Sequence, residues 1–320
     1  MKKILFATTA LIATSGMAAA EIKLGGSARF GLAYDEGNVE ETRVEQRFRV
    51  NIDGITESDA GVKFEVRFRL ESNEDENSAI AGRGPGAARF SVSTGGFRLD
   101  VGNTSDVIDS GDVVDYFGYG VGLTSFIEQS SNGDLDLVGF GAGDQDQTTV
   151  KARYTAGDFT VSASYSDRRA QAADTLTDSA GDIITLEDAI EEQQQYQIGA
   201  SYNFGNYTVG AAFGNTDTPT GDEDFWAASF NGEIGAVAFS VLATDSDGQD
   251  DVTFGASLNY ALSSATDLRF AISDGGADAN ETSFGVGFRH SLGGGVSLRG
   301  GVGQDSDENT IADLGVALSF

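Results

Sequence analysis

The sequence predicts an all-β protein, a sixteen-stranded antiparallel β-barrel that crosses a membrane. Polar and apolar side chains alternate with period two through one segment after another, which is the pattern of strands with two different faces. The connections between these segments alternate between short turns and long loops. No apolar run beyond the first twenty residues is long enough for a membrane helix, so strands would have to do the crossing.

The first twenty residues have the composition of an export signal. Lys2 and Lys3 supply a positive start, residues 4–14 form a short apolar core, and residues 17–20 end in the small side chains that a signal peptidase requires. A membrane anchor is the alternative, but the apolar run is shorter than the ~20 residues of a spanning helix. We therefore expect a signal peptide at residues 1–20, cleaved after Ala20, and a barrel domain at residues 21–320.

The mature chain is strongly acidic and has no cysteine. The sequence holds 20 basic and 50 acidic residues, and loss of the two leader lysines leaves 18 against 50, a net charge of −32. Nucleic acid is therefore excluded as a partner, because its phosphates carry the same sign. The missing cysteines exclude disulfides, thiol nucleophiles and thiolate zinc sites. The 43 glycines and only two prolines suit many strands joined by turns.

The alternation is clearest near the start of the mature chain, where charged residues occupy every second position. In a soluble sandwich the apolar face would cover a core, whereas in a membrane barrel it meets lipid and the charged face lines a water-filled lumen. In the third segment Val62, Phe64, Val66, Phe68 and Leu70 alternate with Lys63, Glu65, Arg67, Arg69 and Glu71. About sixteen segments follow this pattern, at residues 22–34, 43–52, 62–71, 88–93, 97–103, 150–155, 159–165, 196–204, 207–213, 225–231, 236–243, 251–260, 267–273, 282–290, 296–303 and 311–320.

The connections differ in length in a regular way. Short ones are rich in Gly, Asn, Asp and Ser and predict hairpin turns, at residues 57–61, 94–96, 156–158, 205–206, 263–266 and 293–295. Long ones fall between them, at residues 35–42, 72–87, 104–149, 166–195, 214–224, 244–250, 274–281 and 304–310. Long loops on one rim and short turns on the other are typical of outer-membrane barrels. Aromatic residues near the strand ends fit the girdles of such barrels, although strand propensity explains part of them.

Four stretches carry a resemblance to a known family. They are IKLGGSARFGL at residues 22–32, IDGITESDAGV at 52–62, VGN at 101–103 and ADLGVALSF at 312–320. With them the chain resembles the general porins of alphaproteobacteria, of the Rhodobacter type. The resemblance implies a trimer in the bacterial outer membrane and a third long loop folded into the lumen. It also implies that Phe320, as the C-terminal aromatic residue, is a signal to the outer-membrane assembly machinery.

Charge is distributed unevenly, and this predicts a pore constriction. Ten basic residues take lumen positions in the first five strands: Lys23, Arg29, Arg43, Arg47, Arg49, Lys63, Arg67, Arg69, Arg89 and Arg98. We assign seven of them to a basic wall, the arginines at 29, 43, 47, 49, 67, 69 and 89. The arginines at 47, 49, 67 and 69 are the most central, because they lie in the middle of their strands. Residues 104–149 contain no basic residue and nine acidic ones: Asp106, Asp109, Asp112, Asp115, Glu128, Asp134, Asp136, Asp144 and Asp146.

If this loop folds inward, as the resemblance implies, its carboxylates face the basic wall. Opposite charges across a narrow passage create a transverse field that favours polar solutes. Asp106, Asp109, Asp112, Asp115 and Glu128 are the candidates on the loop side. In the alternative interpretation, the arginines only pair with inward acids such as those at positions 45, 65 and 71 and stiffen the wall. The acidic excess favours weak cation selectivity, and the basic wall opposes it.

The function predicted is a water-filled channel for passive diffusion of small hydrophilic solutes and ions. A solute-selective channel is one alternative, and a secreted soluble acidic β-protein or adhesin that binds calcium is another. Residues 245–251 and 305–308 carry oxygen donors of the kind calcium prefers but lack the full twelve-residue spacing, so no cofactor is expected. Residues 185–192 begin with a capping-box pattern and predict a short surface helix. No enzyme is expected, because His290 is the sole histidine and residues 82–86 lack the Lys-Ser/Thr of a phosphate loop.

Overall fold

The computed structural model describes residues 20–74, 87–133, 135, 137, 147–170, 174–177, 183–187, 192–219 and 221–320. The expected signal peptide, except its last residue, lies outside the described residues. So do residues 82–86 and four carboxylates of the long acidic loop: Asp134, Asp136, Asp144 and Asp146.

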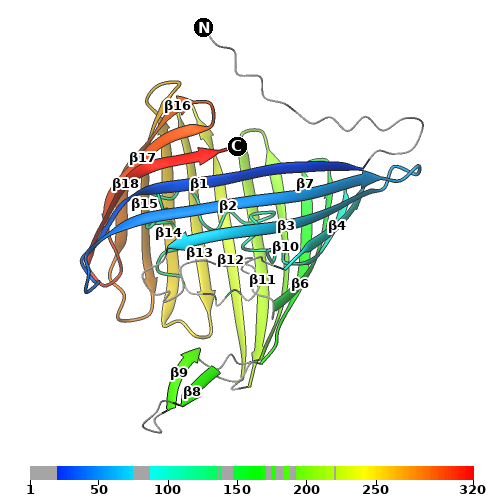
Figure 1. Cartoon of the computed structure of the whole chain (residues 1–320), viewed down its shortest axis with the longest axis horizontal. Helices are drawn as coiled ribbons and strands as arrows, with labels where there is room; N and C mark the ends of the chain where they lie inside the picture. Colours follow the sequence, from blue (N-terminus) through cyan, green and yellow to red (C-terminus); the bar gives the residue numbers. More distant parts are fainter. Residues whose placement is uncertain are drawn as a thin grey trace.

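Sixteen antiparallel strands close into one barrel (Figure 1), which confirms the predicted fold class. Neighbours in the barrel are neighbours in sequence, except that β7 pairs with β10 and β1 closes on β18. The barrel strands are β1 Glu21–Asp35, β2 Thr42–Glu57, β3 Lys63–Glu74, β4 Arg89–Thr94, β5 Phe97–Gly102, β6 Gln147–Ala156, β7 Phe159–Arg168, β10 Gln193–Phe204, β11 Tyr207–Thr218, β12 Gly221–Ile234, β13 Val237–Ser246, β14 Asp251–Ala261, β15 Thr266–Gly276, β16 Ser283–Gly293, β17 Val296–Gln304 and β18 Thr310–Ser319.

The last residue of the chain takes part in closing the barrel. Beyond the β1–β18 ladder, the Gly26 N–H donates to the Phe320 carbonyl at 2.8 Å, and the Phe320 N–H donates to the Gly26 carbonyl at 3.1 Å. The Phe320 ring stacks on Phe48 of β2 with centroids 6.0 Å apart. The C-terminal aromatic residue therefore lies at the seam where the first and last strands meet.

Burial is inverted relative to a soluble protein, and this confirms the outward direction of the apolar face. Large apolar side chains of the wall are exposed, including Phe30 at 55%, Ile198 at 63% and Phe254 at 62%. Hydroxyl side chains on the opposite face are buried, and Ser240, Thr253 and Ser273 have no exposed surface. Apolar residues outside and polar residues inside are what a barrel in hydrocarbon requires.

The long connection between β7 and β10 contains a small antiparallel sheet, β8 Asp174–Thr177 and β9 Ile183–Glu187, which Figure 1 shows beyond the rim of the barrel. The helix predicted from residue 185 is therefore wrong for residues 185–187. The β-branched run Ile183-Ile184-Thr185 favours a strand, and pairing with β8 outweighs the local capping pattern. Among the described residues, no helix has the length and apolar character needed to cross a membrane.

Candidate pore constriction

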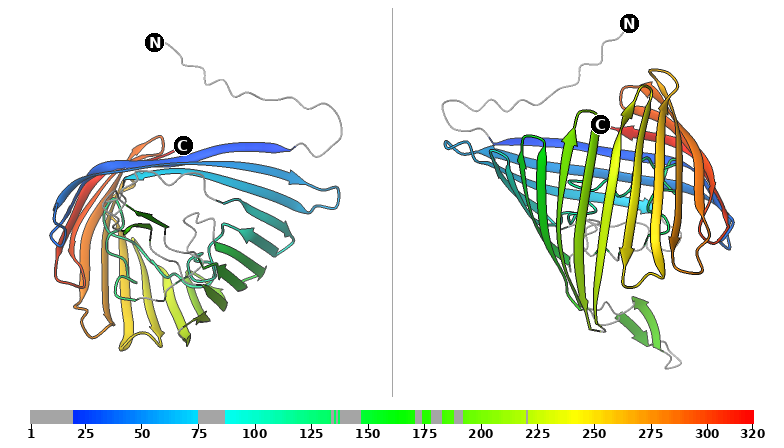
Figure 2. Two further views of the ribbon diagram at one scale, coloured as in Figure 1. Left: turned by 60° about the horizontal axis from the view of Figure 1, so that its bottom comes forward. Right: turned by 180° about the vertical axis from the view of Figure 1, so that it is seen from behind.

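The described part of the connection between β5 and β6, residues 103–133, 135 and 137 and called here the inner loop, lies inside the barrel (Figure 2), as the resemblance implies. Its backbone is irregular, so its N–H groups need partners other than a strand ladder. Side chains of the wall accept these hydrogen bonds. The donors and acceptors are Val107 N–H to Ser164 Oγ (3.3 Å), Ile108 N–H to Gln197 Oε1 (3.0 Å), Asp115 N–H to Ser229 Oγ (2.9 Å), Tyr119 N–H to Ser257 Oγ (2.9 Å) and Asn132 N–H to Ser273 Oγ (3.0 Å).

Asp313 of β18 fixes the loop where it turns past the seam of the barrel. One carboxylate oxygen accepts the Leu123 N–H at 2.7 Å. The other accepts the Thr124 N–H and the Thr124 hydroxyl, each at 2.8 Å. Asp313 is nearly buried, with 6% of its surface exposed. Hydrogen bonds to a charged group are stronger than neutral ones, so this contact is a strong anchor of the loop.

Glycines of the wall let the loop backbone approach closely. A Cβ added at Gly210 of β11 would collide with the Val113 carbonyl, and one at Gly255 of β14 would collide with the Gln129 carbonyl. Both glycines therefore mark places where main chain rests directly on the barrel wall.

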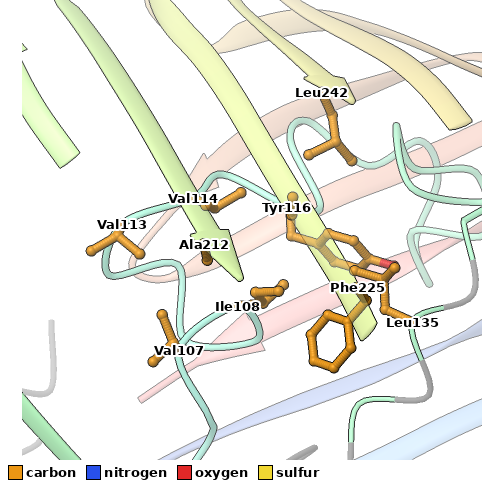
Figure 3. Packing of buried hydrophobic residues seen from close by; sticks show 10 residues of the cluster. Val107, Ile108, Val113, Val114, Tyr116, Leu135, Ala212, Phe225 and Leu242 are labelled. Carbon is orange, nitrogen blue, oxygen red and sulfur yellow. The ribbon is translucent and has the colours of Figure 1, made fainter. Parts of the chain in front are cut away.

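The loop also supplies most of the conventional hydrophobic core among the described residues. Figure 3 shows its side chains gathered against the wall of β11–β13. Val107, Ile108 and Val114 of the loop have no exposed surface, and Phe225 of β12 and Leu242 of β13 meet them from the wall. The loop is thus held by apolar packing as well as by hydrogen bonds.

This docking is one-sided. The hydrogen bonds described between residues 104–137 and the barrel go to β6, β7, β10, β12–β16 and β18. None of those described reaches the inner face of β1–β4, and only the first residue of this stretch bonds back to β5. Within the described residues the loop is therefore not hydrogen-bonded to β1–β4, although Leu123 packs beside Gly31 of β1.

The seven predicted wall arginines divide into two groups. Four form ion pairs with neighbouring carboxylates: Arg29 and Arg43 with Glu45 (2.6 and 2.7 Å), Arg49 with Glu71 (2.6 Å) and Arg67 with Asp53 (2.7 Å). The other three, Arg47, Arg69 and Arg89, have no ion pair among the described residues. Ion-paired arginines and arginines without an ion pair among the described residues therefore occur together on this wall.

The five candidate carboxylates within the described part of the loop have different surroundings. Asp106 is fully buried and accepts the Asp109 N–H at 2.9 Å, so it shapes a turn. Asp112 accepts hydrogen bonds from Lys151 (2.8 Å) and Arg153 (2.6 Å) of β6. Burial opposes its ionisation, but these two cations outweigh burial and hold the pKa of Asp112 below its ordinary value.

Asp115 and Glu128 lie further along the loop. Asp115 accepts the Gly118 N–H at 3.1 Å. Burial, and then the charge of Asp115, raise the pKa of Glu128 to about 7. Glu128 shares a cavity of about 410 Å³ with Arg29, Arg47, Arg289 and Arg299. The loop carboxylate and the wall arginines therefore line one polar cavity.

Sequence reasoning missed the arginines of the last strands. Arg289 of β16 and Arg299 of β17 are direct cross-strand partners and line the same cavity as Glu128. Arg269 of β15 donates to the Gly120 carbonyl of the loop at 3.1 Å. The sequence held the information needed to find them, because closure of the barrel places the final strands beside the first ones. Arg289 also alternates with the outward Phe288, so its inward direction could have been predicted.

We expect the Asp313→Ala variant to loosen the inner loop. Its three hydrogen bonds disappear, at a cost of about 1.5–3 kcal/mol for each bond to a charged group. The single-channel current should become noisier and its mean conductance should rise, as measured in planar lipid bilayers. Asp158→Asn, in the exposed β6–β7 turn, is the matched control and should leave the current unchanged. If the current of Asp313→Ala is as quiet as that of wild type, this anchor does not hold the loop.

Known proteins with the same features agree with this picture. A family model described as Gram-negative porin matches residues 7–310. A porin of Fuscovulum blasticum is 28% identical over 312 residues, which cover 94% of this chain and 100% of the relative. The structure of a triple mutant of the Rhodopseudomonas blastica porin superposes with a TM-score of 0.73 at 25% identity, covering 94% of this chain and 100% of that one.

A second engineered form of that porin gives a TM-score of 0.67 at 25% identity over the same shares of the two chains. Membership of this family implies a channel rather than an enzyme. The match spans most of the chain. The structure agrees with it, because it is a closed barrel with apolar side chains outside, polar side chains inside and a loop in the lumen. The chain belongs to the Gram-negative porins and forms a water-filled channel of the bacterial outer membrane through which small hydrophilic solutes and ions diffuse.

Proposed function

We propose that solutes pass between the inner loop and the arginine-bearing wall, and that this passage is the constriction of the channel. One observation supports the proposal: the described hydrogen bonds of the loop go to β6, β7, β10, β12–β16 and β18, and none goes to the inner face of β1–β4, where polar cavities lie between loop and wall. Charges of opposite sign then face each other across the lumen. Their transverse field orients water and polar solutes and penalises apolar ones.

The candidate residues would divide the work. Arg47, Arg69 and Arg89 supply unpaired positive charge, while Arg29, Arg43, Arg49 and Arg67 are positioned by their carboxylate partners. On the loop side, Asp109, Asp115 and Glu128 supply the opposing charge. Asp106 and Asp112 position the loop, because one is fully buried and the other is neutralised by two cations of β6.

We further propose that the channel is a homotrimer inserted into outer-membrane lipid by the assembly machinery. β4 and β5 have six residues each, which makes this the lowest part of the barrel wall and a natural contact between protomers. Phe90 and Phe97 on these strands expose 55% and 41% of their surface. The Phe320 ring, 63% exposed at the seam, is accessible as an insertion signal. No catalytic step belongs to this function.

The expectation that the protein has no cofactor stays a prediction. No group of three or more His, Cys, Asp or Glu residues suited to a metal occurs within the described part of the chain. In the turn at residues 305–308, the two Asp305 oxygens accept hydrogen bonds from the Asp307 N–H and the Asn309 N–H and amide, at 2.8–3.2 Å. These bonds explain the acidic residue there without a metal.

Purified protein added to a planar lipid bilayer should produce conductance steps in groups of three. The grouping follows because three parallel pores would insert together in each event. The measurement uses a salt solution at neutral pH, with boiled protein as the control for contaminating channels. Steps that occur only singly would contradict the trimer and leave the pore intact, whereas a silent bilayer would contradict the pore itself.

The Arg47→Gln variant should become more cation-selective. Removing one unpaired positive charge from the constriction should raise the permeability of potassium relative to chloride about twofold, a size expected for a partly screened charge in water. The reversal potential in a salt gradient measures this ratio. Arg168→Gln changes charge equally at the end of β7, where Arg168 bonds to Gln193 at 2.6 Å. An equal shift in both variants would remove Arg47 from the constriction.

Cation preference should also rise with pH, with a midpoint near the pKa of Glu128, about 7. Below this pH the carboxyl is mostly neutral, and above it the loop gains a negative charge that faces Arg29, Arg47, Arg289 and Arg299. Between about pH 6 and pH 8 the permeability ratio should change about twofold.

Glu128→Gln should abolish this dependence. His290→Asn is the matched control, because His290 lies on the outer register of β16, bonded to Thr266 at 2.8 Å, and should keep the full effect. A midpoint that persists in Glu128→Gln, or disappears in His290→Asn, would assign the titration to another group.

A further inference from the structure

A second polar cavity, of about 260 Å³, lies where β3–β6 meet the first part of the inner loop. It is separate from the cavity that holds Glu128, and the two share no lining residue. Six basic side chains line it, and only two carboxylates do, Asp100 and Asp112. The basic residues are Arg67, Arg69, Arg89, Arg98, Lys151 and Arg153.

The strand register forces like charges together in this cavity. Arg67 of β3 is directly opposite Arg89 of β4, and Arg98 of β5 is directly opposite Arg153 of β6. Like charges at directly opposed positions destabilise a sheet. Two such pairs in one cavity are a cost that an anion in the cavity would offset.

The available carboxylates do not neutralise this cluster. Asp53 pairs with Arg67 at 2.7 Å, and Glu65 pairs with Arg98 at 2.6 Å. Asp100 also pairs with Arg98, and Asp112 bridges Lys151 and Arg153. Four acidic groups thus serve the six basic ones of the cavity, and Glu65 is also shared with Lys63 at 3.0 Å, which leaves an excess of at least two positive charges.

The excess resides on two arginines. Arg69 donates from its Nε only to the neutral Asn51 side chain, at 3.1 Å. The Arg89 Nε is buried and has no hydrogen-bond acceptor, and no carboxylate of the described residues lies within ion-pair distance of Arg89. Arg89 lines the polar cavity, and a buried guanidinium N–H without an acceptor is stabilised when an anion supplies one.

We propose that this cavity binds a tetrahedral oxyanion of the phosphate type, with Arg69 and Arg89 as its principal ligands. The inference rests on the proposed function, since the anion would reach the cavity through the lumen. Phosphate carries between one and two negative charges near neutral pH, which matches the excess of two. The planar fork of a guanidinium donates two parallel hydrogen bonds to such an oxyanion, which a spherical chloride ion cannot use.

The inner loop supplies further support for an oxyanion. Asp112 already places two carboxylate oxygens against Lys151 and Arg153 at 2.8 and 2.6 Å, so this wall accommodates oxygen anions at hydrogen-bond distance. The hydroxyl-bearing Ser105 and Ser110 line the same cavity. Phosphate and small phosphorylated solutes would therefore pause beside the constriction while uncharged solutes pass.

Inorganic phosphate is the probe for the test. In planar bilayers carrying a potassium chloride current, phosphate added at constant ionic strength should reduce the current in a saturable way, with half-effect at about 1 mM. The Arg69→Gln/Arg89→Gln double variant should require about tenfold more phosphate, because two charge-assisted contacts are lost. The Arg168→Gln/Arg169→Gln double variant has the same change in charge outside the cavity and should respond as wild type does.

Titration calorimetry of the detergent-solubilised barrel with phosphate separates this site from the pore function. The site is supported if phosphate binds wild type and binds about tenfold more weakly only in Arg69→Gln/Arg89→Gln. If bilayers stay silent at the same time, the pore function alone is contradicted. Conducting channels with no saturable phosphate effect and no calorimetric binding would overturn the site and leave the pore standing. Equal phosphate affinity in the two double variants would also overturn it.

Discussion

Hydrocarbon offers no hydrogen-bond partner to a peptide group, so each strand in a membrane must be bonded on both sides. This chain meets the requirement by closing β1 on β18, and the Gly26–Phe320 pair extends that seam to the last residue. Closure also fixes the two faces of every strand, because alternate side chains must point to hydrocarbon or to the enclosed water. The exposed Ile198 and the buried Ser273 are opposite results of this one constraint.

The water-filled interior then has to be organised by polar contacts. Wall hydroxyls such as Ser229 and Ser257 take the place of a strand ladder for the inner loop, and Asp313 adds a charged anchor. Gly210 and Gly255 leave room for the loop backbone to rest on the wall. The hydroxyl-rich and glycine-rich strands therefore hold the loop, and the arginine-rich strands are left to face the passage.

The strands could be predicted because their signal is local. Lys63 to Glu71 alternate strictly, and no other element gives that pattern. The loop path could not be predicted, since nothing near Asp112 in the sequence indicates Lys151 and Arg153 as its partners, nor that Asp106 would be buried. Arg289 and Arg299 were missed because their proximity to Arg29 depends on closure between the two ends of the chain. The helix predicted from residue 185 failed because a four-residue capping pattern says nothing about β8, which pairs there.

The net charge of −32 and the basic cavity act over different distances. Mobile ions screen exposed charges beyond about 8 Å at physiological ionic strength, so acidic residues on the long outer loops mainly set the potential at the mouth of the channel. Inside, the excess charge on Arg69 and Arg89 acts on whatever touches the wall, because burial weakens screening there. A mouth that enriches cations and a wall that retains oxyanions can therefore coexist in one pore. The net charge of the molecule governs which ions reach the channel mouth, whereas the local excess of two charges governs how long an oxyanion stays at the wall. Selectivity between potassium and chloride therefore does not measure the affinity of the wall for oxyanions.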